Sequence, residues 1–465
     1  MRNEVQIMWD AEVDIAIAGA GGCGLVAALT VAEKGLQVAV FEKTDFVLGN
    51  TAASAGMIPA AGTRYQREIG IQETPEEMAE DILKKNHQES NPDLTLALSK
   101  VSGPLVEWMN DKLDMQFSLV TEFKYPGHRN LRMHAPPTRS GLELMKKLKQ
   151  AVNDKDNIYL MLKSQVEKLI LGDKGEVIGI DVQTTDGVQR IKAKKVILAT
   201  NGFGGNTSMV KKFIPEISDA LYFGYEANTG EGIEMALEIG ADVSNMTAYQ
   251  GHAAVNEATG LLVTWGTIMS GGFMVNQNGE RFGNEAQGYS EFALEVVKQE
   301  VQNGYIIIDQ DIYQNLLSIE DFKQLDEMDA FKSSDSIEDL AVKLGINVKS
   351  LKQTYTAFQK NEQGSSDQFG RTDFPKQLTG KLFGIKVSPA LFHTQGGLNI
   401  NEHAQVVNGQ GNVIENLYAG GGTAVGVSGR HAYGYMSGNG LLAALGFGKI
   451  AGDHAVHMIQ QKGME

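Results

Sequence analysis

The stretch Val13–Lys43, VDIAIAGAGGCGLVAALTVAEKGLQVAVFEK, decides the fold of this chain. Its first part predicts a buried strand over Val13–Ala18, followed by a glycine turn and a small-residue helix over about Leu25–Glu33. A second apolar strand, Gln37–Phe41, then ends on the acid Glu42. Strand, turn, helix, strand and acid in this order indicate the first unit of a dinucleotide-binding α/β domain.

The glycines of this turn have separate physical roles. Gly19 allows the tight turn, Gly21 lets the backbone approach a pyrophosphate, and Gly24 lets helix and strand pack closely. The phosphates are expected on the free N–H groups at the start of the helix. Glu42, 18 residues after Gly24, is placed to accept hydrogen bonds from an adenosine ribose.

Two later segments favour FAD over NAD. Gly49–Met57, GNTAASAGM, is a second small-residue loop that could pass close to a flavin, and Val196–Phe203, VILATNGF, is an apolar strand ending in small residues. On these motifs the chain resembles the fumarate reductase/succinate dehydrogenase flavoprotein family, which includes the 3-ketosteroid dehydrogenases. The resemblance runs from Val13 to His454.

Size and composition bound the other possibilities. A chain of 465 residues is too long for one ordinary core, which predicts two domains, and 42% hydrophobic with 21% charged residues is typical of a soluble globular protein. The net charge of −16 argues against a nucleic-acid partner. The single cysteine, Cys23, excludes a disulfide within the chain and a Cys-rich metal or iron–sulfur site. Neither a membrane span nor a signal peptide is recognisable, so a cytoplasmic location is expected.

The predicted fold class is α/β, a Rossmann-like FAD-binding domain with an inserted α+β capping domain. The FAD-binding domain is expected over residues 1–247 and 373–465. Between them, residues 248–372 have fewer glycines and many Lys-containing and acidic helices, which predicts the capping and substrate domain.

The resemblance implies a set of residues around FAD. Asn50 stands where membrane succinate dehydrogenases attach FAD through a histidine, so non-covalent FAD is expected. The expected cofactor-binding residues are Gly19, Gly21, Gly22, Gly24, Glu42, Lys43, Asn50, Thr51, Gly56, Val166, Thr200, Gly202, Gly230, Gly232, Gly421, Gly440 and Leu441.

Three stretches carry the expected chemistry. In Gly271–Tyr289 a signature NxxGxRFxNE is followed by Tyr289, where fumarate reductases carry the arginine that delivers a proton. In 3-ketosteroid Δ1-dehydrogenases a tyrosine in this neighbourhood is the base. His393, in HTQGGL, resembles the histidine that helps fumarate reductases bind a substrate carboxylate. Before the last helix, Tyr435 replaces a dicarboxylate-clamping arginine, and Tyr433 lies nearby.

These tyrosines favour a ketone substrate, because a phenol makes one hydrogen bond whereas an arginine grips a carboxylate with two. We therefore expect FAD-dependent α,β-desaturation of a cyclic ketone or 3-ketosteroid. Tyr435 and the Gly438 N–H would hold the carbonyl, Tyr289 would remove the α-proton, and His393 would support the site.

The alternative is a fumarate-reductase-like enoate reductase acting on an unsaturated carboxylic acid, for which Arg139 or Arg430 could supply the cation. A flavin-binding electron-carrier module is a third, disfavoured possibility. The electron acceptor must be external to the chain: oxygen, a quinone or a separate carrier. Trp108 is expected to restrict the volume of the pocket.

Overall fold

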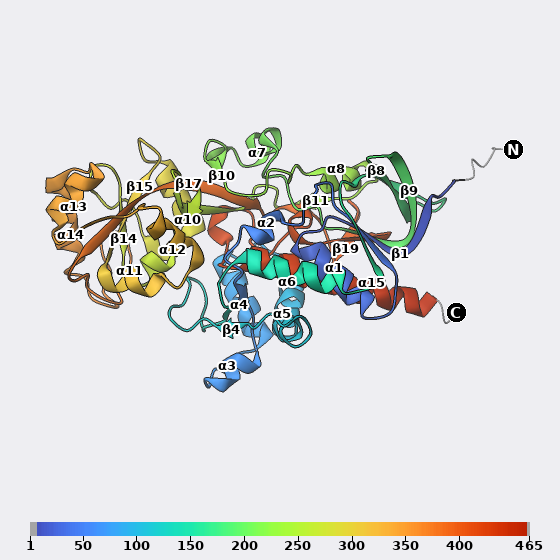
Figure 1. Ribbon diagram of the computed structural model, residues 1–465, viewed down its shortest axis with the longest axis horizontal. Helices are drawn as coiled ribbons and strands as arrows, with labels where there is room; N and C mark the ends of the chain where they lie inside the picture. The colour runs from blue at the N-terminus through green and yellow to red at the C-terminus, as the bar shows by residue number, and fades with distance from the viewer. Residues whose placement is uncertain (1–6, 463–465) are drawn as a thin grey trace.

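The computed structural model describes residues 7–462 of the chain. The molecule is elongated, with one sheet and its helices at each end (Figure 1). At one end lie β1 (Ala11–Ala18), β9 (Gly187–Leu198) and the C-terminal helix α15 (Asn439–Lys462). The other end carries helices α11 (Gln310–Leu316) to α14 (Val348–Phe358).

The first sheet confirms the predicted strand–turn–helix–strand unit. β1 pairs in parallel with both β2 and β9, through Ile17↔Val40 and Ile17↔Ile197, and helix α1 (Gly22–Ala32) follows the glycine turn. Within the described residues this sheet has eight strands along the path β19-β20-β9-β1-β2-β6, with β7 and β8 off the path. Its other strands are β2 (Val38–Phe41), β6 (Ile158–Met161), β7 (Gln165–Leu171), β8 (Val177–Thr184), β19 (Gln405–Val407) and β20 (Val413–Ala419).

The central strands of this sheet are apolar where they are buried, at Ile15–Ala18 of β1 and Val38–Phe41 of β2. α1 packs against α15, and every residue of α1 is buried, which is why its sequence consists of small and aliphatic residues. β8 and β9 pair antiparallel as a hairpin. The α/β fold class is therefore confirmed.

The second sheet follows the order β13-β12-β17-β15-β14, with β10 and β16 added to β17, in the part of the chain that the structure covers. Its strands are β10 (Leu221–Tyr222), β12 (Tyr249–Asn256), β13 (Leu261–Leu262), β14 (Phe273–Val275), β15 (Gly304–Asp309), β16 (Lys332–Ser334) and β17 (Leu382–Thr394). The long strand β17 joins this sheet at residues beyond 372, so it continues the capping sheet towards the first domain. The domain limits at 247 and 372 stay a prediction.

Short elements complete the fold. β3 (Ile58–Pro59), β4 (Ser118–Leu119) and β5 (Met133–Ala135) form a small sheet, and β11 (Val243–Ser244) pairs with β18 (Gly397–Leu398). The remaining helices are α2 (Gly49–Ala52), α3 (Arg64–Glu68), α4 (Pro75–Lys85), α5 (Pro92–Leu113), α6 (Gly141–Asn153), α7 (Thr207–Phe213), α8 (Glu231–Glu238), α9 (Gly266–Met269), α10 (Tyr289–Val297), α12 (Glu320–Glu327) and α13 (Ile337–Leu344). Among residues 7–462, no helix combines the length and apolar character needed to cross a bilayer.

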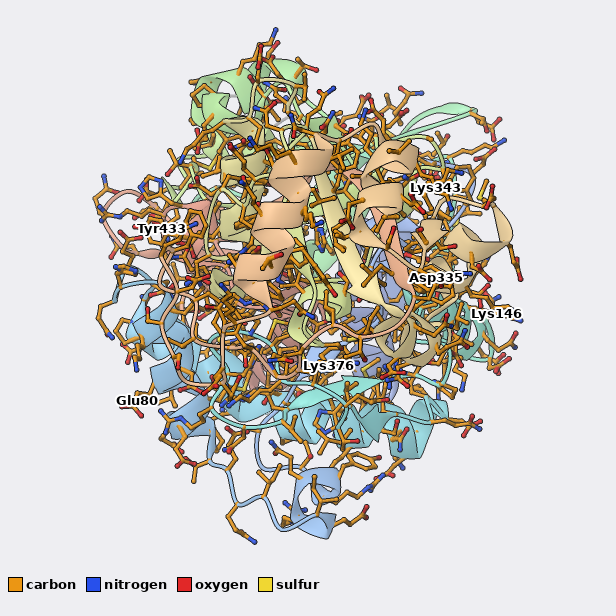
Figure 2. All side chains as sticks on the ribbon, turned by 90° about the vertical axis from the view of Figure 1, so that its left-hand side faces the viewer. Glu80, Lys146, Asp335, Lys343, Lys376 and Tyr433 are labelled. Carbon is orange, nitrogen blue, oxygen red and sulfur yellow. The ribbon has the colours of Figure 1, made fainter. Side chains whose placement is uncertain are left out.

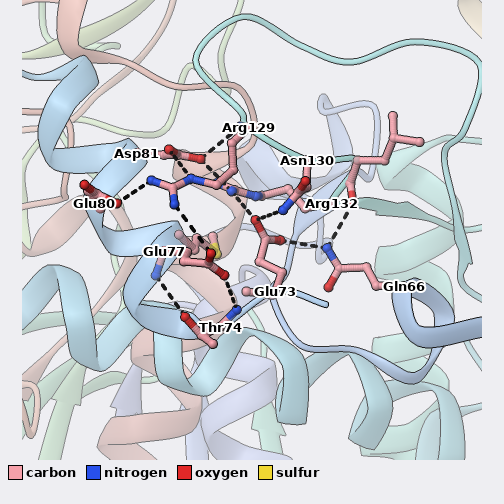
Figure 3. A network of polar contacts seen from close by, with 12 residues as sticks. Gln66, Glu73, Thr74, Glu77, Glu80, Asp81, Arg129, Asn130 and Arg132 are labelled. Carbon is pink, nitrogen blue, oxygen red and sulfur yellow. Dashed lines mark hydrogen bonds and ion pairs between the residues drawn. The ribbon is translucent and has the colours of Figure 1, made fainter. Parts of the chain in front are cut away.

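A buried ion-pair network fixes the segment that leads into β5 (Figure 3). The fully buried Arg132 guanidinium contacts Glu73 and Asp81, and the Arg129 Nε donates to Asp81 at 2.8 Å. A buried arginine needs such partners, since an unpaired charge in the interior costs several kcal/mol. The network positions His128, whose Nε2 lies 3.2 Å from the Ser437 carbonyl oxygen.

Candidate active site

A continuous cavity lies between the two domains and is lined by residues of both. The first domain contributes the glycine turn after β1, the loop around α2 and the start of α15. The second contributes β12, the β13–α9 segment, the start of α10 and the residues at the beginning of α12. The cavity thus has a glycine-lined end in the first domain and a ring-lined end facing the second.

At the glycine-lined end, backbone geometry requires the predicted glycines. Gly19 has φ +102°, and a Cβ there would lie 2.4 Å from the Ala199 oxygen. A Cβ on Gly24 would lie 1.9 Å from the Gly19 oxygen, so α1 can approach the turn only because this residue is glycine. Beside Gly21, in contrast, a Cβ would have nothing within 4 Å. The open space at Gly21, above the start of α1, fits a bound pyrophosphate.

The acid that ends β2 holds this end together. One Glu42 oxygen accepts from the Ala20 N–H at 3.0 Å, and the other accepts from the Thr44 N–H at 3.0 Å. Next to it, the Lys43 ammonium donates to Glu231 at 2.5 Å. A carboxylate fixed in this way keeps lone pairs for further hydroxyl donors, which suits a ribose. The glycine-lined end therefore fits the adenosine and pyrophosphate of FAD.

The predicted cofactor-binding residues fall into two groups. Those that line the cavity are Gly19, Gly21, Gly22, Glu42, Lys43, Asn50, Thr51, Val166, Thr200, Gly421, Gly440 and Leu441. Those that lie behind its wall instead are Gly24, Gly56, Gly202, Gly230 and Gly232. The second group allows close packing: a Cβ on Gly202 would lie 1.9 Å from the Thr394 Oγ1, and one on Gly232 would lie 2.1 Å from the Thr200 Oγ1.

Asn50 is engaged by hydrogen bonds within the protein. Its side-chain oxygen accepts from the Tyr225 N–H at 2.6 Å and from Asn228 at 2.8 Å, and its amide donates to the Phe392 oxygen at 3.2 Å. Asn50 thereby joins α2 to the second sheet. Non-covalent attachment of FAD stays a prediction.

At the ring-lined end, Tyr289, Tyr435 and Gly438 converge. The rings of the two tyrosines have centroids 6.1 Å apart, and the Gly440 N–H at the start of α15 donates to the Tyr435 hydroxyl at 3.4 Å. Gly438 has φ +82°, and a Cβ there would lie 2.5 Å from the Pro59 ring. The backbone can take this conformation only because the residue is glycine, and Gly438 lines the cavity together with the two phenols.

Both phenols are held in the protonated form. Burial raises the pKa of Tyr289 well above its ordinary value and Tyr435 adds to this shift, while the N–H of Gly438 opposes it. Burial likewise raises the pKa of Tyr435 to about 12, against the N–H groups of Gly440 and Gly438. A phenol acting as an acid or a base works best with a pKa lowered towards neutrality, so the role of Tyr289 in proton transfer stays a prediction. Two neutral hydroxyls are suited to donating hydrogen bonds.

His393 lies beside this pair, as predicted, and is neutral. Its ring centroid is 5.9 Å from that of Tyr435, and its Nδ1 is 2.9 Å from the Gln395 amide nitrogen. Burial lowers its pKa to about 4. A Cβ on Gly440 would lie 2.2 Å from the His393 Nε2, so helix α15 begins directly against this imidazole.

A stack of four rings, which the sequence did not indicate, forms one wall. Phe223 stacks on Phe392 with centroids 4.7 Å apart, Phe392 on His252 at 5.1 Å, and His252 on Tyr289 at 4.5 Å. The Ala254 N–H donates to the His252 Nδ1 at 3.1 Å, which makes Nδ1 the acceptor and leaves the hydrogen on Nε2. Burial lowers the pKa of His252 to about 3, so the ring is neutral and offers one N–H donor.

Other lining residues also escaped the sequence analysis. Trp265 and Tyr125 stand edge-on to Tyr289, with centroids at 6.3 and 6.4 Å. Gln250 and His252, two residues apart on the fully buried strand β12, share one face of it. Two polar residues at this spacing within an otherwise apolar strand are the sequence feature that could have identified them as cavity-lining residues.

Two expected residues lie outside the cavity. The Tyr433 hydroxyl donates to Glu89 at 2.8 Å, and the ring packs on His87, near the outline of the molecule in Figure 2. The expectation that Tyr433 contacts the substrate is therefore wrong. The Trp108 indole N–H donates to Glu33 at 3.1 Å on the outside of α5, so the expected effect of Trp108 on pocket volume is wrong.

Of the two arginines considered for a carboxylate, Arg139 lines the cavity and Arg430 is exposed outside it. Arg139 is ion-paired with Glu122 and has φ +50°, a conformation that is uncommon for arginine. It lies close enough to Tyr125 for its charge to act on that phenol. The part of the chain described here contains no group of three or more His, Cys, Asp or Glu residues placed to hold a metal ion.

Comparison with known proteins agrees with this geometry. The model of the FAD binding domain family matches residues 14–441. The probable fumarate reductase Ifc3 of Shewanella frigidimarina is 31% identical over 446 residues, which cover 95% of this chain and 74% of that protein.

Solved structures give the same result. The open conformation of a flavocytochrome c3 fumarate reductase matches with a TM-score of 0.79 and 30% identity, over 97% of this chain and 79% of that one. The 3-ketosteroid delta1-dehydrogenase from Sterolibacterium denitrificans matches with a TM-score of 0.76 over 96% of this chain and all of that one. At 19% identity, the second likeness supports the shared fold alone.

Proposed function

The chain belongs to the FAD-binding flavoprotein family that includes the fumarate reductases and is an FAD-dependent oxidoreductase acting on CH–CH groups; from this premise we propose that it reduces the C=C bond of an α,β-unsaturated carboxylic acid. Of the two reactions that the sequence predicts, the relatives favour this one over ketone desaturation. Relatives and solved structures at 30% identity or more include fumarate reductases, and fumarate is such an acid.

The observation that carries this proposal is the likeness to fumarate reductases, at 30–31% identity over 95–97% of this chain. Reduction of a conjugated C=C bond needs a hydride at one carbon and a proton at the other. Tyr289, whose ring lies 6.1 Å from that of Tyr435 at the ring-lined end, would supply that proton. Desaturation runs the same transfers in reverse, so the phenol would then accept the proton and its raised pKa does not distinguish the two directions.

The carboxylate or carbonyl oxygen of the substrate would be bound by the remaining donors at this end. These are the Tyr435 hydroxyl, the Gly438 N–H and the Nε2–H of His252. Arg139 supplies a cation to the same cavity. Bound FAD supplies hydride exchange, and Gly21, Glu42 and Asn50 are among the residues that would hold it. Its electrons come from an external carrier.

Ketone desaturation remains the second candidate because of one specific observation. Arg139 is already paired with Glu122, so the two positions that face each other at the ring-lined end carry phenols rather than free cations. A single hydroxyl–carbonyl contact suits a neutral ketone.

The two candidates differ in a direct spectroscopic experiment. Anaerobically reduced holoenzyme is mixed with fumarate, urocanate or cinnamate, and reoxidation of the flavin is followed; oxidised holoenzyme is mixed with saturated cyclic ketones, and bleaching is followed. The proposal expects rapid reoxidation by at least one acid. Bleaching by ketones with no reoxidation by any acid would establish the second candidate instead.

A further inference from the structure

Asp321, at the start of α12 in the capping domain, is a carboxylate that lines the cavity without a partner. Among residues 7–462 it has neither a hydrogen bond nor an ion pair. Other acids of this domain are partnered: Asp309 accepts from Lys376 at 2.7 Å and from the Ile312 N–H at 3.0 Å, and Asp326 accepts from Tyr313. An unpartnered, half-buried carboxylate in a cavity is available for a ligand.

Asp321 lies at the end of the cavity that β13 and α12 line. Tyr289 stacks on His252 of strand β12, and β13 joins β12 at Val255↔Leu262, three residues further along. At the rise of a β-strand this places Leu262 roughly 10 Å from the level of His252 and Tyr289. Helix α12 packs against β13, and Leu262 and Asp321 line the same cavity.

The favourable effect of the helix dipole on acidic residues does not by itself explain why the Asp321 carboxylate faces the cavity. Both Glu320 and Asp321 lie in the first turn of α12, where negative charge is favourable. Glu320 is exposed to solvent and accepts from Gln324 at 2.9 Å, whereas the Asp321 side chain is half-buried, and desolvation raises its pKa. A ligand that donates a hydrogen bond to Asp321 would offset this desolvation.

We propose that Asp321 is the recognition residue of an outer subsite, which binds a hydroxyl or a protonated amine at the end of the substrate remote from its C=C bond. The inference rests on the proposed function, since it extends the same cavity. It defines the substrate class as an elongated unsaturated acid with an aromatic or cyclic body along Trp265 and Tyr125 and a hydrogen-bond donor at its far end.

The test is a binding measurement on oxidised holoenzyme, read from the flavin absorbance spectrum. The probes are cinnamate and 3-(biphenyl-4-yl)acrylate, each without a substituent and with a para-hydroxyl or para-aminomethyl group at the far end. Wild type is expected to bind at least one donor-bearing probe about tenfold tighter than its parent, as a charge-assisted hydrogen bond requires. Comparing the short and the long probe shows how far the probe's carboxylate lies from Asp321. Comparing the two substituents shows whether Asp321 prefers a hydroxyl or an amine.

The variants are D321A, D321N and the matched control E320Q, which alters the neighbouring exposed acid of the same helical turn. D321A is expected to lose the preference for both substituents. D321N keeps a neutral acceptor, so it should lose the amine preference and retain part of the hydroxyl preference. E320Q should leave both preferences intact. Thermal unfolding and flavin content verify that each variant is folded.

The inference is overturned if wild type prefers no donor-bearing probe, or if D321A retains the preference of wild type. Its failure is distinguishable from that of the proposed function. If the preference depends on Asp321 but none of the acids reoxidises the reduced flavin, the subsite stands and the proposed reaction is wrong. If acids are reduced and D321A still discriminates, the subsite alone fails.

Discussion

The two ends of the cavity differ in the atoms that line them: backbone atoms at one end and side-chain rings at the other. The glycine-lined end presents backbone, at Gly19 and Gly21, where a side chain would collide or fill the space above α1. The ring-lined end presents side chains, among them Tyr125, His252 and Tyr435, which come from distant segments. A backbone-lined site is restricted to glycine by sterics, whereas a ring-lined site can change its rings and keep its fold.

The strongest test of this difference is Gly24→Ala at the glycine-lined end. The added Cβ would lie 1.9 Å from the Gly19 oxygen, and the backbone must move to relieve the clash, at a cost of about 3 kcal/mol. We expect loss of bound flavin and a marked fall in melting temperature. Gly409→Ala is the control, since its Cβ would have nothing within 4 Å. A Gly24→Ala protein with full flavin content and wild-type melting temperature would contradict the steric argument.

Tyr289→Phe tests the ring-lined end, where chemistry rather than folding should respond. Removing the hydroxyl removes the proposed proton donor, so we expect the rate of flavin reoxidation by an acid to fall about 10²- to 10⁴-fold, with flavin content unchanged. Tyr433→Phe, outside the cavity, should retain the wild-type rate. A Tyr289→Phe enzyme within about threefold of wild type would remove Tyr289 from the mechanism, since proton transfer is worth more than this.

The same difference explains what could be predicted from the sequence. Gly19, Gly21 and Glu42 could be placed because a local rule links their spacing to a turn, a phosphate and a ribose. His252 could not be placed, because its stacking on Tyr289 depends on how β12 meets α10, a contact between segments with no local signature. The upward shift of the Tyr289 pKa could not be derived either, because it depends on the burial of the phenol.

The sequence also placed some residues in the right region with the wrong contact. Gly202 and Gly232 belong to segments that reach the cavity, yet both lie behind its wall against threonine side chains. Tyr433 is two residues from Tyr435, but the short helical turn Ala432–Gly434 directs it to Glu89 on the other side. Neighbouring positions in a turn point in different directions, and spacing alone does not reveal which one faces a ligand.

Arg139→Gln addresses the choice between an acid and a ketone. If Arg139 holds a substrate carboxylate, its loss should raise KM for an unsaturated acid about tenfold, the value of a charge-assisted hydrogen bond, with little change for a neutral ketone. Arg430→Gln is the control, because Arg430 is exposed outside the cavity. Equal changes for acids and ketones would exclude a carboxylate-binding role for Arg139.

The smallest effect is expected from pH, and it again concerns only the ring-lined end. Burial lowers the pKa of His393 to about 4 and raises that of Tyr435 to about 12, so neither group changes charge between about pH 6 and about pH 9. The reoxidation rate should vary less than about twofold over this range, since no protonation step of these groups falls within it.

Below this range the direction of the stability change follows from His393. Its folded-state pKa lies below the ordinary value of 6.5, so its contribution to stability is present above pH 6.5 and is lost as pH falls through about 4. The free energy of unfolding should therefore decrease on acidification from neutral pH, measured by denaturant titration of holoenzyme at several pH values. A reoxidation rate that falls with a midpoint near pH 6.5 would contradict this prediction, and so would a free energy of unfolding that stays level down to pH 4. Either result would indicate that the His393 imidazole is solvated rather than buried beside Tyr435.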